Sequence, residues 1–219
     1  MAWNCIVEND DIQLYKTVLP PVGVNTYYLF GRNTLIVVDP GTGARRFLEE
    51  AGKSERKKKA IILTHTHFDH IAGADEFKDF NLFVSKEAQD GLFNPSVNLS
   101  SGFSSKGFEI DKRSVLNLSR GKNRFGDFEF DAALFPGHTQ GDTVFNFGPF
   151  ILTGDFVFAD SIGRTDFTFS DPYQMKESLK RFRQYLKDIP GETLILPGHM
   201  EHTTVEQLLK RNYFLGANF

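Results

Sequence analysis

Short apolar runs separated by turn residues recur along this chain, and they predict many short strands. The runs 27–30 and 35–38 flank a Gly-Arg-Asn turn at 31–33, which predicts a β-hairpin. Further strands are expected at 60–63, 82–84, 115–118, 128–135, 144–147, 150–153 and 193–196. No uninterrupted apolar run exceeds four residues. A transmembrane helix needs about 20 apolar residues, so none is expected.

Helical periodicity is found in three segments, at 44–51, from 172 to about 188, and at 205–213, and a helix is also expected to begin near His70. Asp171 stands before Pro172, which is the order of an N-cap followed by proline at the first helical position. The apolar residues of this second helix recur at helical spacing, so that one face is expected to pack on the core: Met175, Leu179, Phe182 and Leu186.

Strands dominate both halves of the sequence, each half carries helices, and no linker separates them. We therefore predict one α+β domain over residues 1–219, built as a layered sandwich. The segment 91–113 is rich in Gly, Ser, Asn and Phe, and a loop of that length is often functional. Two alternatives stay open for Phe93, Phe103 and Phe108: they form an apolar wall or lid over the site, or they pack onto the body of the domain.

The charge balance excludes several classes of partner. Lys and Arg number 25 and Asp and Glu number 28, a net charge of −3, which gives no electrostatic footprint for nucleic acid. The N-terminal segment carries Glu8, Asp10 and Asp11, where a signal peptide would be basic and then apolar. The single cysteine, Cys5, rules out an intramolecular disulfide and favours the cytoplasm. We expect a small-molecule substrate, no nucleic-acid or membrane partner, and an undetermined oligomeric state.

Three histidines and one aspartate fall within six residues directly after the strand at 60–63. They are His65, His67, Asp69 and His70. Imidazole and carboxylate groups are ligands for zinc and other divalent metals. In a bent loop, His65 and His67 can point to one side while Asp69 and His70 reach a second centre. The sequence therefore predicts a metal site here.

Three more candidate ligands share one context, the end of a strand followed by glycine. His138 and His199 each follow an apolar strand and a Pro-Gly turn, and Asp155 follows Gly154. Glycine allows a tight bend and a close approach of neighbouring groups. If four strand ends converge on one edge, they deliver five histidines and two aspartates, enough for two metal ions that share one carboxylate.

The run His65-Thr66-His67-Phe68-Asp69-His70 resembles the H-x-H-x-D-H motif of the metallo-β-lactamase superfamily. His138, Asp155 and His199 match the three later ligand positions of that family in order and context, and Asp39-Pro40-Gly41 resembles its early turn. The resemblance spans about residues 25–199. It implies a four-layer αβ/βα sandwich with the site at the edge where the two sheets meet.

The family pattern also implies the role of each ligand. His65, His67 and His138 would hold one metal, Asp69, His70 and His199 a second, and Asp155 would bridge the two. The cofactors would be two divalent ions, with Zn²⁺ first and Fe or Mn as alternatives. A bridging hydroxide would attack a carbonyl carbon, and Asp69 would orient it and pass a proton to the leaving group. The implied reaction is hydrolysis of a thioester, a lactone or an amide.

The stretch 161–167, Ser-Ile-Gly-Arg-Thr-Asp-Phe, resembles the G-R-x-D segment of short, single-domain glyoxalase II-like hydrolases. That branch implies a hydroxyacylglutathione-like thioester as substrate. Persulfide dioxygenases carry a similar stretch and use a single iron, whose ligands would here be His67 or His65, His138 and Asp155. This oxygenase and a lactonase of the same fold remain the alternatives. Zinc β-lactamases commonly have Cys at the position of Asp155, which disfavours that activity here.

Three further polar residues lie near these motifs. Arg164 and Asp166 are expected to form a buried ion pair that shapes the loop below the metals, or else to contact the substrate. His202 is an additional histidine close to the last ligand position, expected beside the ligands or on the surface. The short glyoxalase II-like forms usually have Gly-Pro where this chain has Met200 and Glu201.

Overall fold

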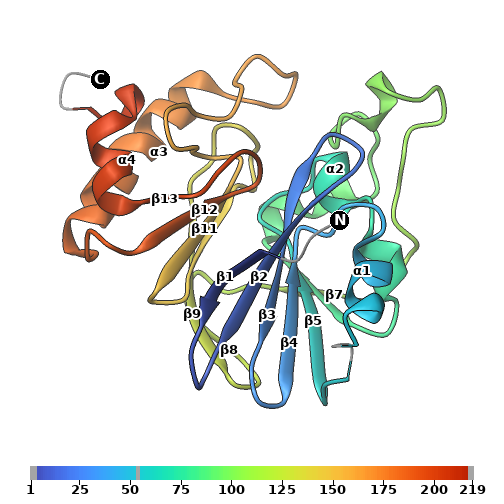
Figure 1. Cartoon of the computed structure of the whole chain (residues 1–219). Helices are drawn as coiled ribbons and strands as arrows, with labels where there is room; N and C mark the ends of the chain where they lie inside the picture. Colours follow the sequence, from blue (N-terminus) through green and yellow to red (C-terminus); the bar gives the residue numbers. More distant parts are fainter. Residues whose placement is uncertain (1–3, 53–54, 217–219) are drawn as a thin grey trace.

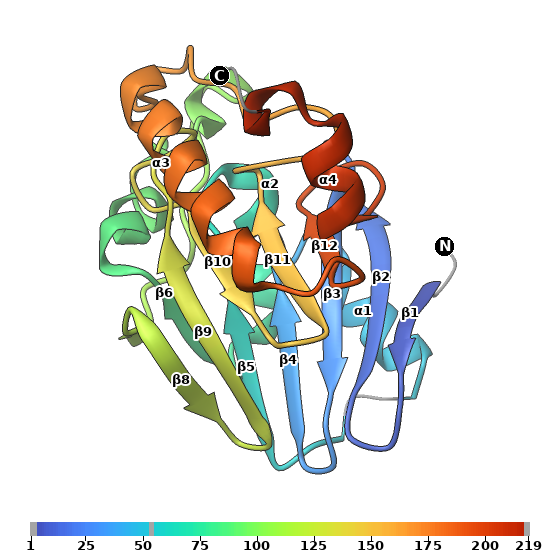
Figure 2. The same ribbon diagram turned by 90° about the vertical axis from the view of Figure 1, so that its left-hand side faces the viewer.

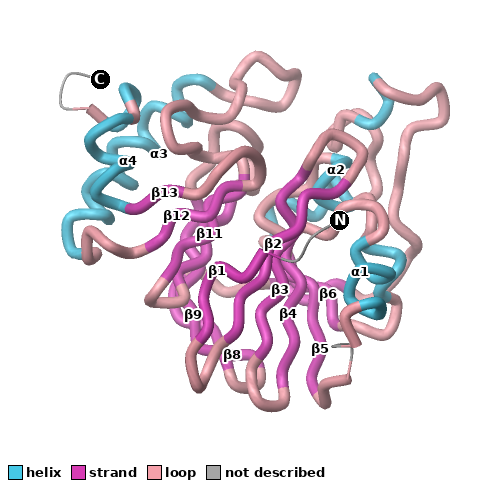
Figure 3. The backbone as a smooth tube through the Cα atoms, in the orientation of Figure 1, coloured by secondary structure: helices cyan, strands magenta, loops and turns pink. Residues whose placement is uncertain are grey.

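Two mixed β-sheets face each other in the computed structural model, with helices on the two outer sides (Figures 1 and 3). The structure describes residues 4–52 and 55–216. The first sheet has seven strands in the order β1-β2-β3-β4-β5-β6-β7, and the second has six in the order β13-β12-β11-β10-β9-β8. Within the described residues, no helix has the length and apolar character needed to cross a membrane.

The first sheet begins as an antiparallel meander and continues with parallel strands. Strands β1 to β4 pair antiparallel, and β5, β6 and β7 follow parallel to β4. Their bounds are β1 (Asn4–Glu8), β2 (Gln13–Leu19), β3 (Val24–Phe30), β4 (Thr34–Val38), β5 (Lys58–Ile62), β6 (Asn81–Val84) and β7 (Val115–Asn117).

The second sheet is antiparallel except between β11 and β12, which run parallel. Its strands are β8 (Gly121–Phe125), β9 (Phe128–Leu134), β10 (Thr143–Asn146), β11 (Phe150–Gly154), β12 (Leu194–Pro197) and β13 (Thr203–Thr204). The parallel pair matters for function because β11 and β12 deliver their C-terminal ends to one edge of the sheet.

The α-helices are α1 (Ala44–Glu50), α2 (Phe68–Ile71), α3 (Pro172–Tyr185) and α4 (Val205–Arg211). Short 3₁₀ helices are η1 (Ala74–Phe77), η2 (Lys86–Leu92), η3 (Ser100–Gly102), η4 (Leu186–Asp188) and η5 (Tyr213–Leu215). Helices α3 and α4 lie across the second sheet in Figure 2. Helix α1 lies on the opposite side of the molecule, beside the first sheet (Figure 1).

Three apolar clusters separate these layers. Along β4, Leu35 and Val37 belong to the cluster beneath α1, whereas Ile36 and Val38 belong to the cluster between the sheets. The third cluster lies between the second sheet and helices α3 and α4. Because successive strand residues point to opposite faces, a strand covered on both faces is apolar throughout. The four-layer αβ/βα sandwich expected from the resemblance is confirmed.

The predicted elements agree with the structure where local signals are strong. Asp171 caps α3 and accepts hydrogen bonds from the backbone N–H groups of Tyr173 and Gln174 at 2.8 and 3.0 Å. The expected apolar face of α3 and η4 is buried in the third cluster. Strands β1, β2 and β8 were not predicted, because their polar and apolar residues lack a clear strand pattern. Helix α2 begins at Phe68, two residues before the start expected near His70.

Candidate metal centre

The predicted ligands come from strand ends that meet at one edge of the sandwich. The segment after β5 carries His65 and His67 and leads into α2, His138 follows β9, and His199 follows β12. In Figure 2 the arrowheads of β9 and β11 point to the edge at which α2 lies. Parallel pairing of β4 with β5 and of β11 with β12 brings their C-terminal ends to this edge.

The structure brings together both ligand groups expected from the resemblance. The candidate ligand atoms of His65, His67 and His138 lie within 4.8 Å of one another. The same holds for the group formed by Asp69, His70 and His199. We call these six residues, together with Asp155, the metal cluster.

Asp155 lies between the two groups and contacts members of each. Its Oδ1 is 3.4 Å from Nε2 of His70, and its Oδ2 is 3.5 Å from Nε2 of His199. The same Oδ2 is 3.8 Å from Nε2 of His138 in the other group. This is the position that a carboxylate shared by two metal ions requires.

Four buried polar atoms of the metal cluster have no hydrogen-bond partner: Nε2 of His65, His70 and His138, and Oδ1 of Asp155. Buried polar atoms in folded proteins are nearly always paired. All four are lone-pair donors of the kind that bind divalent cations, and they belong to the same cluster. The residues present therefore fit a metal-binding site.

Backbone carbonyl groups hold two of the histidine rings. Nδ1 of His138 donates to the carbonyl oxygen of Arg164 at 2.8 Å, and Nδ1 of His199 donates to that of Gly23 at 3.1 Å. A hydrogen bond at Nδ1 fixes the ring orientation and leaves the Nε2 lone pair for a metal. Both carbonyl groups come from loops remote in sequence from the histidines that they orient.

Asp39 orients one histidine from each ligand group, a role that sequence reasoning missed. Its Oδ2 accepts hydrogen bonds from Nδ1 of His70 at 2.9 Å and from the Thr64 hydroxyl at 2.6 Å. Because that hydroxyl donates to Asp39, its oxygen is free to accept from Nδ1 of His65, 3.1 Å away. The sequence could have indicated this role. Asp39 directly follows β4, and because β4 and β5 are parallel neighbours, the end of β4 lies beside the end of β5, from which the ligand histidines follow.

Electrostatics in the metal cluster favour a cation. Among the described residues, Asp39, Asp69 and Asp155 form ion pairs with histidines alone. Burial opposes the charged form of Asp155, yet His70 and His138 hold the pKa of Asp155 well below its usual range. Burial also opposes protonation of His70, but the carboxylates around it raise its pKa. Bound metal ions would supply the positive charge that this surplus of carboxylates demands.

Neutral histidines are the form that binds metal, and burial keeps two of them neutral. Burial, helped by the neighbouring His138, lowers the pKa of His67 to about 3. The pKa of His65 is also lowered, first by burial and then by the surrounding histidines. At neutral pH both imidazoles therefore offer a free lone pair without first losing a proton.

Asp142 shapes the turn that carries His138, and it too escaped prediction. Its carboxylate accepts hydrogen bonds from the backbone N–H groups of His138 and Thr139 at 2.9 and 2.8 Å. Burial raises the pKa of Asp142 to about 6. The residue holds the loop conformation and lies outside the ligand groups.

Two glycines allow the strand ends to approach this closely. A Cβ atom at Gly198 would lie 2.3 Å from Oδ1 of Asp155 and 2.6 Å from the ring of His70. A Cβ atom at Gly163 would lie 2.1 Å from the backbone oxygen of Asp155 and 2.8 Å from the ring of His138. Any side chain at either position would displace a candidate ligand.

A cavity of about 830 Å³ opens over the metal cluster and is lined by His67, Asp69, His138, Asp155 and His199. Residues from several loops surround its mouth: Val22, Phe103, Arg164, Phe169 and Met200. We call these five residues the rim. His202 is exposed and belongs to neither the metal cluster nor the rim.

The expectation that Arg164 and Asp166 form a buried ion pair is wrong. The two side chains do pair, with contacts of 2.9 and 2.8 Å, but each is 66% exposed. The loop that carries them faces the cavity mouth, so solvent reaches both groups. The backbone of Arg164 shapes the site instead, because its carbonyl oxygen holds His138.

The segment 91–113 is partly packed and partly exposed. Buried Asn98 donates from Nδ2 to the carbonyl oxygens of Gly91 and Phe108, which ties the segment together. Phe108 packs against the core beneath the first sheet, whereas Phe103 lines the cavity. Packing onto the body of the domain is therefore confirmed for Phe108, whereas Phe103 lies over the site as part of the cavity wall.

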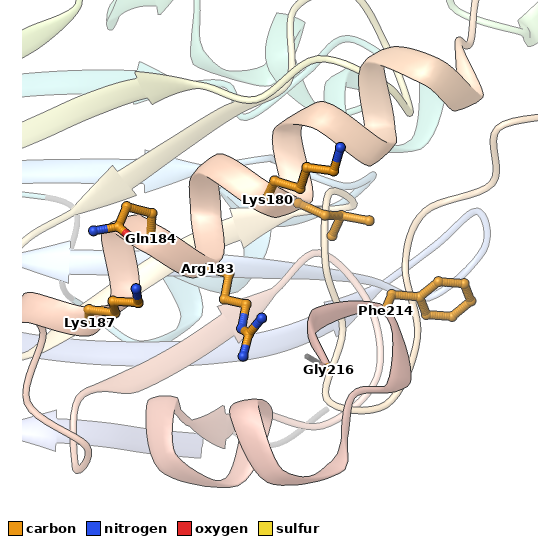
Figure 4. A pocket seen from close by; sticks show the side chains of 7 residues that line it. Lys180, Arg183, Gln184, Lys187, Phe214 and Gly216 are labelled. Atoms are coloured by element: carbon orange, nitrogen blue, oxygen red, sulfur yellow. The ribbon is translucent and has the colours of Figure 1, made fainter. Parts of the chain in front are cut away.

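A second pocket lies between α3 and the C-terminal segment and has a different character. Lys180, Arg183, Gln184 and Lys187 line it from α3 and η4, and Phe214 lies across from them (Figure 4). Its volume is about 210 Å³. No residue of the metal cluster reaches this pocket, so the chemistry argued from those residues belongs to the larger cavity.

Comparison with known proteins identifies the family. Residues 19–199 match the model of the metallo-β-lactamase superfamily, and the chain belongs to that superfamily. A probable metallo-hydrolase of Streptococcus pyogenes is 32% identical over 203 residues, which cover 89% of this chain and 86% of that protein. The hydroxyacylglutathione hydrolase GloC of Haemophilus influenzae is 28% identical over 83% of this chain and 87% of its own length.

Two solved structures are similar over most of the chain. The B3 metallo-β-lactamase BLEG-1 has a TM-score of 0.83 and 27% identity, and the match covers 93% of this chain and all of that one. The protein TTHA1623, solved in a di-iron-bound form, has a TM-score of 0.76 and 28% identity, covering 91% of this chain and 99% of the other. Together with the clustered histidines and aspartates, these relatives support a metal-dependent hydrolase.

Proposed function

We propose that this protein is a dinuclear metallohydrolase that cleaves thioesters, with a hydroxyacylglutathione-like compound as its first candidate substrate. The position of Asp155 is the observation that supports two metal ions, because its carboxylate contacts histidines of both ligand groups. A complete second group, Asp69, His70 and His199, favours this proposal over a single-iron persulfide dioxygenase. The thioester is supported by the similarity to GloC and by the Gly163-Arg164-Thr165-Asp166 stretch beside the cavity.

The proposed ligands are His65, His67 and His138 for one metal and Asp69, His70 and His199 for the other, with Asp155 shared. Zn²⁺ is the first candidate, and Fe and Mn also suit nitrogen and oxygen donors. When bound, the two divalent ions would lower the pKa of a water molecule toward neutrality and polarise the substrate carbonyl. The chain itself supplies orientation, through the hydrogen bonds at Nδ1 of the histidines.

Asp69 is the proposed proton carrier. Burial opposes its charge, but His70 and His199 lower its pKa, so it is ionised at neutral pH. Its Oδ2 lies 3.0 Å from Nε2 of His199, inside the metal cluster. In the proposed hydrolysis, a carbon–oxygen bond forms to water and the carbon–sulfur bond breaks. Asp69 accepts the proton of the attacking water and returns it to the departing sulfur.

The test is the hydrolysis of S-D-lactoylglutathione by metal-replete protein of known metal content, followed by the loss of thioester absorbance. The variant Asp69→Asn keeps the size of the side chain and removes its basicity. We expect the variant to lower kcat by a factor of about 10² to 10⁴ while circular dichroism stays unchanged. No turnover by fully metallated wild-type protein would refute the glutathione thioester as substrate.

Hydrolysis of a β-lactam is the second candidate: Asp155 at the position where zinc β-lactamases commonly have Cys disfavours it, but the similarity to BLEG-1 over 93% of the chain favours it. The same preparation is therefore assayed with a chromogenic cephalosporin, and oxygen uptake is recorded with glutathione persulfide. Cephalosporin turnover without thioester turnover would replace our proposal by a β-lactamase. Persulfide-dependent oxygen uptake with one iron per chain would replace it by an oxygenase.

A further inference from the structure

The walls of the cavity above the metal cluster are predominantly apolar. Its lining takes large side chains from separate segments of the chain: Val22, Phe68, Phe103, Phe158, Phe167 and Met200. The polar groups that could react lie together at the bottom, where His67, Asp69 and Asp155 reach the cavity. A concave apolar site with a few convergent polar groups is the usual form of a small-molecule site.

Three of these apolar side chains are exposed although they surround one opening. Phe103 is 70% exposed, Met200 63% and Val22 51%. Phe103 is the C-cap residue of η3, Met200 lies in the loop after β12, and Val22 lies in the turn between β2 and β3. Phe103 is held beside the site by its ring contact with Phe68, with centroids 4.4 Å apart. A group of exposed apolar residues at one cavity indicates contact with an apolar ligand.

The backbone at Met200 is strained in a way that presents its side chain to the cavity. Its φ is 65°, in the left-handed region that residues with a Cβ atom seldom adopt. Asn25 holds the segment by donating from Nδ2 to the carbonyl oxygens of Pro197 at 2.9 Å and Met200 at 2.8 Å. Lys16 pairs with Glu201 at 3.4 Å. Strain maintained beside a functional site indicates that the strained residue has a use there.

The residues that line the cavity offer little positive charge to an anionic carrier, the thiol part of the thioester substrate. Arg164 is the one Lys or Arg among the residues that line this cavity. Its guanidinium is already paired with both carboxylate oxygens of Asp166 and lies 4.4 Å from the ring centroid of Phe167. Among the lining residues, a carrier rich in carboxylate or phosphate groups would therefore meet no guanidinium or ammonium group except this paired Arg164. Recognition falls to the apolar part of the substrate.

We propose that this cavity binds the acyl group of a thioester whose acyl part is apolar and longer than lactoyl, with Phe103, Met200 and Val22 closing against it. The inference rests on the thioester cleavage proposed above, and it names an apolar acyl group in place of the hydroxyacyl group of the first candidate substrate. Burial of each methylene group against these side chains would favour longer acyl groups. The reacting carbonyl would then lie over the metal cluster at the bottom of the cavity.

The test uses acetyl, butanoyl, hexanoyl and octanoyl thioesters of N-acetylcysteamine, a short neutral carrier. In the wild-type protein, kcat/KM should rise by about fourfold for each methylene group that becomes fully buried. Met200→Gly and Phe103→Ser should each flatten this dependence on acyl length. The matched control is Tyr173→Ser, which removes an exposed aromatic ring of α3 outside the cavity lining and should keep the wild-type slope.

Folding defects are separated from loss of recognition by the choice of glycine at position 200. Glycine adopts a φ of 65° without a Cβ penalty, so Met200→Gly should be at least as thermostable as the wild type. If kcat/KM depends less on acyl length in a stable variant, the change is then due to the lost side chain. Two outcomes would overturn the acyl-group proposal and leave the proposed thioesterase function standing. One is a dependence of kcat/KM on acyl length that is unchanged in both variants. The other is wild-type turnover that does not depend on acyl length.

Absence of all thioester turnover in metal-replete protein would refute the proposed function and still leave the cavity testable. The probe is then the thioether N-acetyl-S-octylcysteamine, whose binding is measured by calorimetry against the S-methyl compound. Tighter binding of the octyl compound, weakened by Met200→Gly and Phe103→Ser, would support an apolar ligand site. Equal or undetectable binding of both compounds would overturn it.

Discussion

Most side chains of the metal cluster are buried, and four of its five histidines are held by a hydrogen bond at Nδ1, whereas the rim side chains stand largely in solvent. His70 is buried, its Nδ1 is bonded to Asp39, and its Nε2 faces Asp155. Phe103 and Met200, which line the same cavity, are mostly exposed. The cluster is built on strand ends of two sheets and the rim on loops. Chemistry requires groups fixed to within about 0.5 Å, while selection among substrates tolerates and uses adaptable loops.

Removal of the metal ions should have the largest effect of all, because it acts on the metal cluster and leaves the rim side chains untouched. Chelation would leave the buried carboxylates without a counter-charge and the orphaned Nε2 atoms without a partner, so the free energy of unfolding should fall. With free metal about 1,000-fold above its dissociation constant, the loss is about 4 kcal/mol. Calorimetric melting with and without chelator measures it. An unchanged Tm in protein whose metal has been removed would contradict a metal cluster of this kind.

A glycine-to-alanine substitution, made once beside the metal cluster and once beside the rim, compares the two regions directly. In Gly198→Ala the new Cβ atom would fall 2.3 Å from Oδ1 of Asp155, and overpacking of this kind destabilises by about 1–3 kcal/mol. Metal stoichiometry should fall with it. Gly102→Ala is the control beside Phe103, where a Cβ atom meets nothing within 4 Å. We expect wild-type metal content there; equal losses in both variants would remove the distinction between the regions.

Asp39→Asn isolates the contribution of the residue that orients His65 and His70. Asparagine has the same shape and tolerates the φ of 48° found at this position, so the backbone is spared. It loses the negative charge that accepts from Nδ1 of His70 and from the Thr64 hydroxyl. Metal affinity should fall by about 10- to 100-fold, measured by competition with a chromophoric chelator. Unchanged affinity would show that the rings are held without Asp39.

Asp166→Asn should have the smallest effect, because the pair that it breaks is exposed at the rim. The melting temperature should stay at the wild-type value. The released Arg164 guanidinium could then meet an anionic carrier, so KM for a glutathione thioester should fall by about fivefold or less, with no change for N-acetylcysteamine thioesters. A loss of stability or of metal would show instead that the pair supports the cluster.

Sequence reasoning was most successful where the signal was local. The six-residue run that contains His65, His67, Asp69 and His70 predicted two neighbouring ligand groups, and the structure gathers the same side chains. The cap and apolar face of α3 were also predicted, since both depend on spacing within one helix. Strands β1, β2 and β8 escaped because their pairing partners, rather than their own patterns, define them.

By itself, the sequence determined the donor atoms, the strand ends that carry them and the family to which they belong, because these features are written in short runs of residues. Only the tertiary structure decided how the donors are held and what surrounds them. Asp39 contacts His70 across 31 positions of the chain, and Gly23 contacts His199 across 176. The exposure of the Arg164–Asp166 pair and the apolar rim likewise arise where separate loops meet, and no local pattern records such a meeting.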